Sequence, residues 1–205
     1  MSKRNILILF AHPRLDRSIA NKRMMQEVRD LPGVTFVDLY ATYPRFEIDV
    51  RVEQERLTKN DVIIFQHPLY WYSTPSIMKE YQDLVLEYGF AYGSEGQALK
   101  DKLFMTATTT GGPKEAYCTQ GYQHFPLRQL LTPFEQTAHL CHMIYLPPFV
   151  LYSAGHANEE KRLVEHCRKY ARLLEALRDD RYDLEKAQSF DTISDQSDQL
   201  IRGGN

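Results

Sequence analysis

The segment FQHPLYWYSTP, residues 65–75, gathers one histidine, two prolines, one tryptophan and two tyrosines directly after an apolar run. Side chains with flat rings can form a wall against a planar ligand, while nearby peptide N–H groups meet the ligand's polar edge. The alternative is an aromatic cap over the end of a sheet, or a contact between subunits. The residues predicted to form the wall are Pro68, Leu69, Tyr70, Trp71 and Tyr72. Trp71→Ala is therefore expected to weaken the retention of such a ligand.

A second segment, AHPRLDRS at residues 11–18, has the residues of an anion site. Ser18 is predicted to cap a helix, whose first N–H groups are free and carry the positive end of the helix dipole. A phosphate would be held there by Ile19, Ala20, Asn21 and His12, with Arg14 or Arg17 nearby. The alternative is an ordinary N-cap beside solvated arginines. The chain has neither GxGxxG nor GxxxxGK, so a dinucleotide fingerprint and a P-loop both lack their defining residues.

A third segment, TTTGGPKEAY, follows another apolar run. The residues of interest are Thr109, Thr110, Gly111 and Gly112. Glycine lets the backbone approach a ligand closely, because it has no Cβ and accepts unusual dihedral angles. Amide groups here could stabilise negative charge on a ring held by the aromatic segment. An ordinary tight turn is the alternative for this motif.

Short apolar runs predict the strands that position these segments. They cover residues 5–11, 34–40, 61–66, 102–109 and 145–152. Helical patterns fill the gaps, with starts predicted at Ser18, at Thr74 before Pro75 and at Thr132 before Pro133. The second and fifth runs read as edge strands because they contain polar residues or prolines. Five β/α units then give an α/β fold, a flavodoxin-like doubly wound parallel five-stranded sheet of order 2-1-3-4-5, with the three segments at one rim.

Composition limits the class of protein. The 205 residues are 43% hydrophobic and 25% charged, as in one ordinary globular domain, which we predict at residues 1–177. Residues 178–205 form a polar tail of extended or partly disordered composition. A net charge of −2 argues against nucleic-acid binding. Three widely spaced cysteines favour a reducing cytoplasm, and prolines within the uncharged stretch 136–158 argue against a membrane span.

Other chemistries have weaker support. His139, Cys141 and His142 are close in sequence, but no further ligand completes a metal shell, so no metal is expected. Cys141 and Cys167 continue apolar helix stripes, and only Cys118 is expected to be accessible. A hydrolase would need a GxSxG elbow, which the chain lacks. An electron carrier of the flavodoxin type would share the fold but would be more acidic.

Together these residues resemble the flavodoxin-like NAD(P)H:quinone oxidoreductase family, and within it the ancillary flavoprotein subunits of glutathione-gated potassium efflux systems. The resemblance covers about residues 5–177 and rests on AHPRLDRSIANKRM, DLYATYPRFEIDV, EQERL, IIFQHPLYWYSTPSIMKEY, GFAYG, ATTTGGPKEAY, LLTPFEQTAHLCHM and LPPF. It implies a homodimer with one flavin per subunit, FMN rather than FAD, and NADPH or NADH as hydride donor to a quinone. The phosphate would lie near His12 and residues 18–21, and the ring near residues 68–72 and 109–112.

The resemblance also implies roles for two further residues. Tyr117 falls where the family carries a tyrosine that faces the site of hydride transfer. A histidine follows it six residues later in the family, but this position is Gln123 here and the histidine is His124. His124 then either acts through a shifted loop or is a surface residue. The rival function is a regulatory subunit that activates a potassium efflux channel, with reductase activity secondary.

Overall fold

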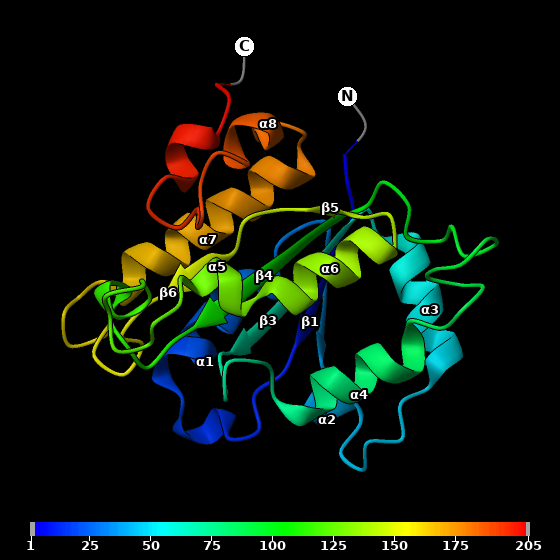
Figure 1. Ribbon diagram of the computed structural model, residues 1–205, viewed down its shortest axis with the longest axis horizontal. Coiled ribbons are helices and arrows are strands. Elements are labelled where there is room, and N and C mark those ends of the chain that lie inside the picture. The colour runs from blue at the N-terminus through cyan, green and yellow to red at the C-terminus, as the bar shows by residue number, and fades with distance from the viewer. Residues whose placement is uncertain (1–2, 204–205) are drawn as a thin grey trace.

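A six-stranded parallel sheet forms the centre of the computed structural model, which describes residues 3–203 (Figure 1). The strands are β1 (Ile6–Phe10), β2 (Val34–Asp38), β3 (Val62–Pro68), β4 (Leu103–Thr109), β5 (Ile144–Tyr145) and β6 (Phe149–Leu151). Their order is β2-β1-β3-β4-β5, with β6 also paired to β4. The predicted flavodoxin-like order is thus confirmed.

The central strands are buried on both faces. All residues of β1, β3 and β4 are buried, which explains their nearly continuous apolar runs. The register pairs Phe10 with Gln66 and Pro68 with Thr109, so these strands end close together. Their carboxyl ends face the lower left of Figure 1, where the loops after them gather. The three predicted segments therefore meet at one rim.

The fifth predicted strand is wrong in one respect, because residues 145–152 form no single strand. Two short strands pair with β4 at different places, Leu103 with Ile144 and Ala107 with Phe149. Between them lie Pro147 and Pro148, which have no N–H for a continuous ladder. The chain therefore steps along the edge of β4 in two pieces.

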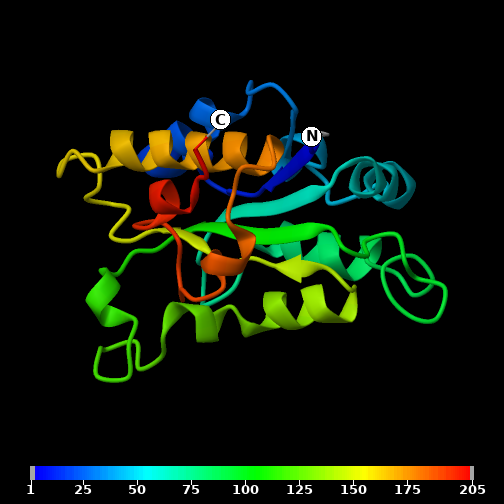
Figure 2. The ribbon, with the colours of Figure 1, turned by 90° about the horizontal axis from the view of Figure 1, so that it is seen from above.

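Helices cover both faces of the sheet. The α-helices are α1 (Ile19–Val28), α2 (Leu39–Thr42), α3 (Val50–Lys59), α4 (Ser76–Val85), α5 (Leu127–Leu130), α6 (Thr132–Leu140), α7 (Leu163–Arg178) and α8 (Leu184–Ala187). Short 3-10 turns are η1 (Leu15–Arg17), η2 (Lys114–Ala116) and η3 (Ser197–Leu200). In Figure 2, α1 and α7 lie on one face of the sheet and α4, α5 and α6 on the other. The apolar core accordingly forms two layers, one on each side of the sheet.

Two of the three predicted helix starts are confirmed, at Ser18 and at Thr132. Ser18 caps α1, and its side chain accepts a hydrogen bond from the Asn21 N–H. Thr74 is not a cap, because α4 begins at Ser76 after Pro75. α6 begins at Thr132, followed by Pro133 as predicted, but Thr132 does not cap it: its hydroxyl donates to the Gln129 carbonyl, and Leu131 holds the N-cap position because α5 runs almost directly into α6. Only the start at Thr74 is wrong, by two residues.

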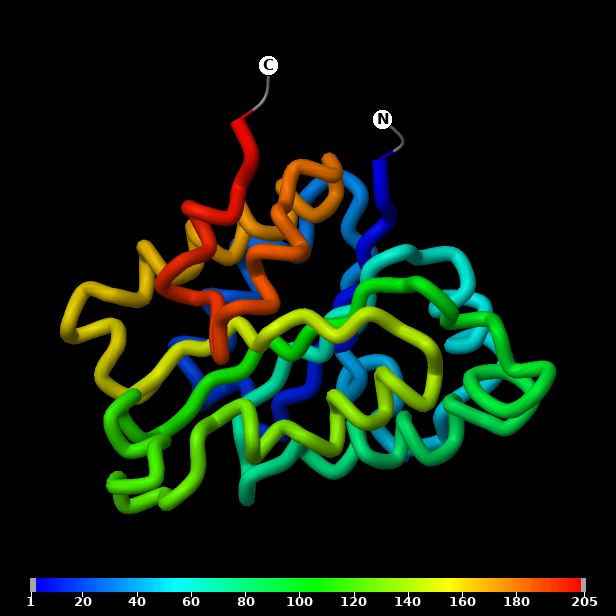
Figure 3. Tube along the Cα trace, turned by 45° about the horizontal axis from the view of Figure 1, so that its top comes forward, coloured from blue at the N-terminus to red at the C-terminus, as the bar shows by residue number. Residues whose placement is uncertain are grey.

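The C-terminal tail is folded over residues 178–203, contrary to the extended or partly disordered chain expected from its composition. Tyr182, Ala187, Ile193 and Leu200 are buried in the core layer that contains α1 and α7. In Figure 3, an orange-red loop of the tail reaches the yellow segment of β5 and β6. Residues 1–2 of the predicted domain and residues 204–205 of the predicted tail lie outside the part of the chain that the structure describes. A few buried apolar residues therefore anchor a mostly polar stretch.

Across residues 3–203 we find no helix with both the length and the apolar character needed to cross a membrane.

Candidate functional site

An open cavity of about 410 Å³ lies at the carboxyl ends of β1, β3 and β4. It is lined by His12, Arg14, Arg17, Ser18, Ile19, Ala20, Asn21, Pro68, Leu69, Tyr70, Thr109, Thr110, Gly111, Ala154 and Gly155. All three predicted segments contribute to the lining. Of the predicted ligand-binding residues, Trp71, Tyr72 and Gly112 lie outside it, and so do Tyr117 and His124.

One end of the cavity is the N-terminus of α1. The Asn21 N–H is capped by Ser18, while the N–H groups of Ile19 and Ala20 have no hydrogen-bond partner among the described residues. The Asn21 side chain donates to Ser18 Oγ at 3.1 Å and to Thr109 Oγ1 at 3.0 Å. It therefore fixes the first turn of α1 against the end of β4. Two free amides at the positive end of a helix suit a phosphate.

His12 adds a neutral donor beside this helix end. Its Nδ1 accepts a hydrogen bond of 3.2 Å from the Arg14 N–H, which leaves the ring hydrogen on Nε2. Burial lowers the pKa of His12 below its ordinary value, against smaller opposing effects of Asp16 and Asp38. The ring also meets Tyr70 edge to face at 6.0 Å. A neutral imidazole held in this way can donate to an anion without carrying charge itself.

The arginines of this segment are partly neutralised. Arg14 donates to both carboxylate oxygens of Asp16 at 3.1 Å, and the Arg17 guanidinium lies 3.9 Å from the same carboxylate. This pairing lowers the pKa of Asp16 and raises that of Arg14. Two guanidinium groups against one carboxylate leave a net positive charge at the mouth of the cavity.

The aromatic segment forms a tight hairpin. Tyr70 and Ser73 exchange backbone hydrogen bonds of 3.2 and 3.0 Å, and both residues between them have positive φ, 50° at Trp71 and 63° at Tyr72. This combination is that of a type I′ turn, which favours Asn and Gly rather than bulky side chains. Trp71 is 93% exposed, and Tyr72 is 52% exposed. The wall against the cavity is thus made by Pro68, Leu69 and Tyr70, while the tip of the hairpin points into solvent.

The glycine segment follows β4, next to the hairpin that follows β3. Leu69 N–H donates to the Thr109 carbonyl at 2.8 Å, which joins the two loops. The Thr110 hydroxyl donates to the Gly112 carbonyl at 2.9 Å and closes the turn. A Cβ at Gly111 would meet nothing within 4 Å, so this position is open to a ligand. The N–H groups of Gly111 and Gly112 have no partner within residues 3–203.

Tyr117 lies beside the cavity rather than in its lining. A Cβ at Gly112 would lie 3.5 Å from the Tyr117 hydroxyl and 2.7 Å from that of Tyr122, so both phenols crowd this glycine. Tyr117 is nearly buried and packs on Tyr152 at 5.7 Å between ring centroids. Burial raises the pKa of Tyr117 above its ordinary value of 10.0. The neutral phenol can therefore donate a hydrogen bond throughout the physiological pH range.

His124 is exposed, on a loop where its φ is 61°. It donates its N–H to the Gly121 carbonyl at 2.9 Å. His139 and His142 are also exposed, whereas Cys141 is buried in the core. Among the described residues, no group of three or more His, Cys, Asp or Glu is placed to hold a metal ion. Cys141 and Cys167 are buried as expected, and Cys118 is half-buried.

The search by sequence missed Ala154 and Gly155 as lining residues. They follow β6, and their place depends on its pairing with β4, where Ala154 N–H donates to the Thr110 carbonyl at 2.9 Å. It also missed Tyr122 over Gly112 and the buried His67 at the end of β3. The small residues 153–155, which directly follow the last predicted strand, were the one available signal for Ala154 and Gly155.

These features define an α/β protein with a phosphate-type helix N-terminus and a flat-walled cavity at the carboxyl ends of its central strands. Residues 4–174 match the family described as having the flavodoxin-like fold. The chain belongs to this family.

Comparisons with known proteins narrow the class. The chain is 44% identical over 171 residues to the glutathione-regulated potassium-efflux system ancillary protein KefG of Yersinia enterocolitica, covering 83% of this chain and 92% of that protein. Among solved structures, general stress protein 14 of Treponema denticola in complex with FMN has a TM-score of 0.80 and 36% identity, covering 84% and 99%. An NADPH-quinone reductase from P. pentosaceus has a TM-score of 0.72 and 31% identity, covering 82% and 97%.

Proposed function

We propose that the chain is an FMN-dependent NAD(P)H oxidoreductase that passes hydride to quinones or related electrophiles. The observation that carries the proposal is the cavity of about 410 Å³, where free backbone N–H groups and apolar side chains meet at the ends of three parallel strands. The FMN complex of the T. denticola relative and the NADPH-quinone reductase of P. pentosaceus support the same cofactor and reaction.

The residues of the cavity fit FMN at both of its ends. The free N–H groups of Ile19 and Ala20 and the Nε2–H of His12 would hold the phosphate. The ring system would lie between the wall of Pro68–Tyr70 and the turn at Thr109–Gly112, where a Cβ at Gly111 would meet nothing within 4 Å. We propose FMN rather than FAD, with NADPH or NADH as donor.

The protein's contribution to the reaction would be orientation and charge stabilisation. The flavin ring, when bound, supplies the two-electron redox chemistry. The free N–H groups of Gly111 and Gly112 would stabilise negative charge at its edge. Tyr117, kept neutral by the burial that raises its pKa, would donate a hydrogen bond to the oxygen of the acceptor. His124 would have at most an indirect part in this arrangement, because it is exposed and outside the cavity lining.

A visible absorption spectrum of the purified protein, mixed with FMN and then desalted, tests the proposal. A flavin band that stays with the protein and bleaches under nitrogen on adding NADPH or NADH is the expected result, with quinone restoring the band. A colourless protein after desalting would overturn it. Comparing the two nucleotides at equal concentration would give the donor preference.

A second function is favoured by the 44% identity to KefG, an ancillary protein of a glutathione-regulated potassium-efflux system. We propose that the chain also binds the cytoplasmic part of such a system. A pull-down with that domain, using FMN-loaded protein, should retain the complex. Failure to bind with the protein fully folded would count against this role and leave the reductase proposal untouched.

We also propose a homodimer. Several large apolar side chains are exposed around the candidate site, namely Trp71, Tyr72, Tyr122 and Phe125. Exposed apolar side chains gathered on one side of a protein often mark an interface. Light scattering coupled to size-exclusion chromatography should give twice the chain mass of 24.0 kDa, and a monomer at micromolar concentration would contradict this.

A further inference from the structure

The C-terminal tail closes the open edge of the sheet. Gln188 Nε2 donates to the Tyr145 carbonyl at 2.6 Å, and the Ile193 N–H donates to the Pro148 carbonyl at 3.1 Å. The Ser194 hydroxyl accepts a hydrogen bond from the Val150 N–H. Backbone groups of an edge strand left unpaired would be open to other chains. We call residues 188–195 the C-terminal strap.

The strand that the strap contacts, β6, is followed directly by residues that pack against the cavity lining. Beyond Val150, the Leu151 carbonyl accepts from the Thr110 N–H at 2.9 Å. The Ser153 N–H then donates to the Gly112 carbonyl at 3.0 Å, and the Ala154 N–H to the Thr110 carbonyl at 2.9 Å. The turn at residues 110–112 is therefore held by hydrogen bonds to β6 and to the residues after it. Whatever fixes β6 also fixes this turn.

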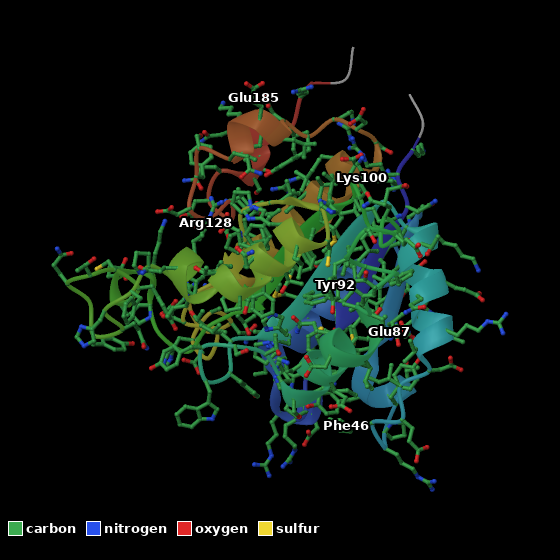
Figure 4. The ribbon with its side chains drawn as sticks, turned by 45° about the vertical axis from the view of Figure 1, so that its right-hand side comes forward. Phe46, Glu87, Tyr92, Lys100, Arg128 and Glu185 are labelled. Carbon is green, nitrogen blue, oxygen red and sulfur yellow. The ribbon has the colours of Figure 1, made fainter. Side chains whose placement is uncertain are left out.

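A second connection reaches the loop that carries Tyr117. Asp195 forms an ion pair of 2.6 Å with Lys114, the first residue of η2, which ends directly before Tyr117. Beyond this loop, on α5, Arg128 Nη1 donates to the Phe190 carbonyl at 3.2 Å. Figure 4 shows Arg128 between the ribbon of α5 and the orange C-terminal segment. The strap thus contacts the Tyr117 loop before the tyrosine and the helix α5 that follows the loop.

The strap lies outside the region shared with the family, which ends at residue 174. The sheet, the phosphate end and the aromatic hairpin all lie within the shared region. The contacts of the strap are therefore an addition to a site whose main parts are common to the family.

We propose that the C-terminal strap is a positioning element for the acceptor side of the cavity. Ser194 acts through Val150 on the turn at residues 110–112, and Asp195 acts through Lys114 on Tyr117. Neither residue lines the main cavity, so neither is expected to touch the cofactor. The part of this inference that concerns the acceptor rests on the proposed reductase function.

The test compares variants of the full chain loaded with FMN. Asp195→Asn removes the pair to Lys114, and the double variant Ser194→Ala/Asp195→Asn also removes the bond to Val150. The matched control is Asp198→Asn, which breaks the tail's ion pair with Arg172 on α7 at 2.8 Å and has no contact with the Tyr117 loop. Asp195→Glu keeps the carboxylate and should therefore retain the wild-type KM and exchange rates.

Two readouts are measured. For the acceptor quinone, KM should rise about threefold in Asp195→Asn and about tenfold in the double variant, while the Kd for FMN changes less than twofold. Backbone hydrogen exchange over residues 110–117 should be about tenfold faster in the double variant and unchanged in Asp198→Asn. Because Asp195→Asn removes only an exposed pair, it is expected to keep the fold even if the double variant does not.

The outcomes distinguish positioning by the strap from the proposed reductase function. Faster exchange over residues 110–117 in Asp195→Asn and the double variant, without change in the control, would support positioning by the strap whether or not quinone is reduced. Unchanged exchange, or equal acceleration in Asp198→Asn, would overturn it. If exchange is faster in the variants but the wild-type protein reduces no quinone, the proposed reductase function and the acceptor role are overturned. The coupling between strap and loop would stand.

Discussion

At the scale of single residues, the candidate site depends on a few polar side chains that fix separate backbone segments to one another. Asn21 is the clearest case, since its amide joins Ser18 at the start of α1 to Thr109 at the end of β4. His12 is held through Nδ1 by the loop that it belongs to, and so presents Nε2–H. The residues that would contact a ligand are thus positioned by bonds made within the protein.

Ser18→Ala should weaken both α1 and the binding of phosphate. Loss of a serine N-cap costs about 1 kcal/mol of stability. Displacement of the first turn should raise the Kd for FMN about tenfold, measured by quenching of flavin fluorescence. Asp49→Ala is the matched control, because Asp49 caps α3 with a bond of 3.1 Å to the Val52 N–H and lies outside the cavity. An equal loss of FMN affinity in both variants would contradict the role of Ser18.

Tyr117→Phe should lower kcat/KM for the acceptor by roughly a hundredfold or more, as expected for a lost donor in the transition state. The Kd for FMN should not change. Because burial raises the pKa of Tyr117 above 10.0, the wild-type rate should show no decline from this group as the pH approaches 10. Tyr88→Phe, at an exposed tyrosine outside the cavity lining, is the control. Wild-type kinetics in Tyr117→Phe would remove the tyrosine from the mechanism.

At the scale of elements, the aromatic hairpin between β3 and α4 combines an unfavourable backbone with exposed rings. Trp71 and Tyr72 both have positive φ, a conformation that costs a residue with a Cβ about 1–2 kcal/mol. Strain of this kind persists where the surrounding structure holds it, and it concentrates at functional sites. The hairpin therefore favours a role in binding over a purely structural turn.

Replacing Trp71 and Tyr72 by Asn and Gly should stabilise the protein while weakening its function. The Asn-Gly turn suits positive φ at both positions, so thermal unfolding should shift upward by several degrees, equivalent to about 1–2 kcal/mol. Acceptor turnover should fall, because two rings next to Tyr70 at the edge of the cavity are lost, whereas FMN retention should change little, since neither ring lines the cavity. Asp101→Gly relieves another positive φ, 64°, away from the cavity, and should stabilise the protein with function unchanged. Retained function in the Asn-Gly variant would mean that the rings contribute nothing to the site.

At the scale of the whole molecule, burial of titratable groups links stability to pH. His67 is fully buried at the end of β3, where its Nδ1 is hydrogen-bonded to the Pro68 carbonyl and its Nε2 has no partner among residues 3–203. Burial lowers the pKa of His67 to about 4. On the opposite face of the sheet, burial lowers the pKa of His166 to about 3. Both rings are therefore neutral in the folded protein at pH 7.

The free energy of unfolding should fall on acidification. The unfolded chain binds a proton at His67 below its ordinary pKa of 6.5, whereas the folded chain does so only near pH 4, so stability is lost as the pH falls from about 6.5 to 4. The contribution is on the order of 3 kcal/mol. Urea unfolding of His67→Gln should show a shallower loss over this interval than the wild type. His139→Gln, at an exposed histidine, should follow the wild type, and identical pH slopes in His67→Gln would contradict the assignment.

Much of the candidate site could be predicted before the structure, because its parts are local. Ser18 caps its helix through a bond to the nearby Asn21, and the residues after β1, β3 and β4 must meet where parallel strands end. The wall was predicted only in part. Leu69 and Tyr70 line the cavity, but Trp71 does not, because a two-residue turn directs the chain outward.

The sequence by itself determined the main elements and their order, because apolar runs and helical periods depend on residues that are close together in the chain. Only the tertiary structure decided how distant segments combine. It divided the last predicted strand into β5 and β6, brought Ala154 and Gly155 into the cavity, and buried Ile193 and Leu200 of a mostly polar tail. Such contacts depend on surfaces far apart in the chain, where a single apolar residue can be an anchor without leaving any periodic pattern.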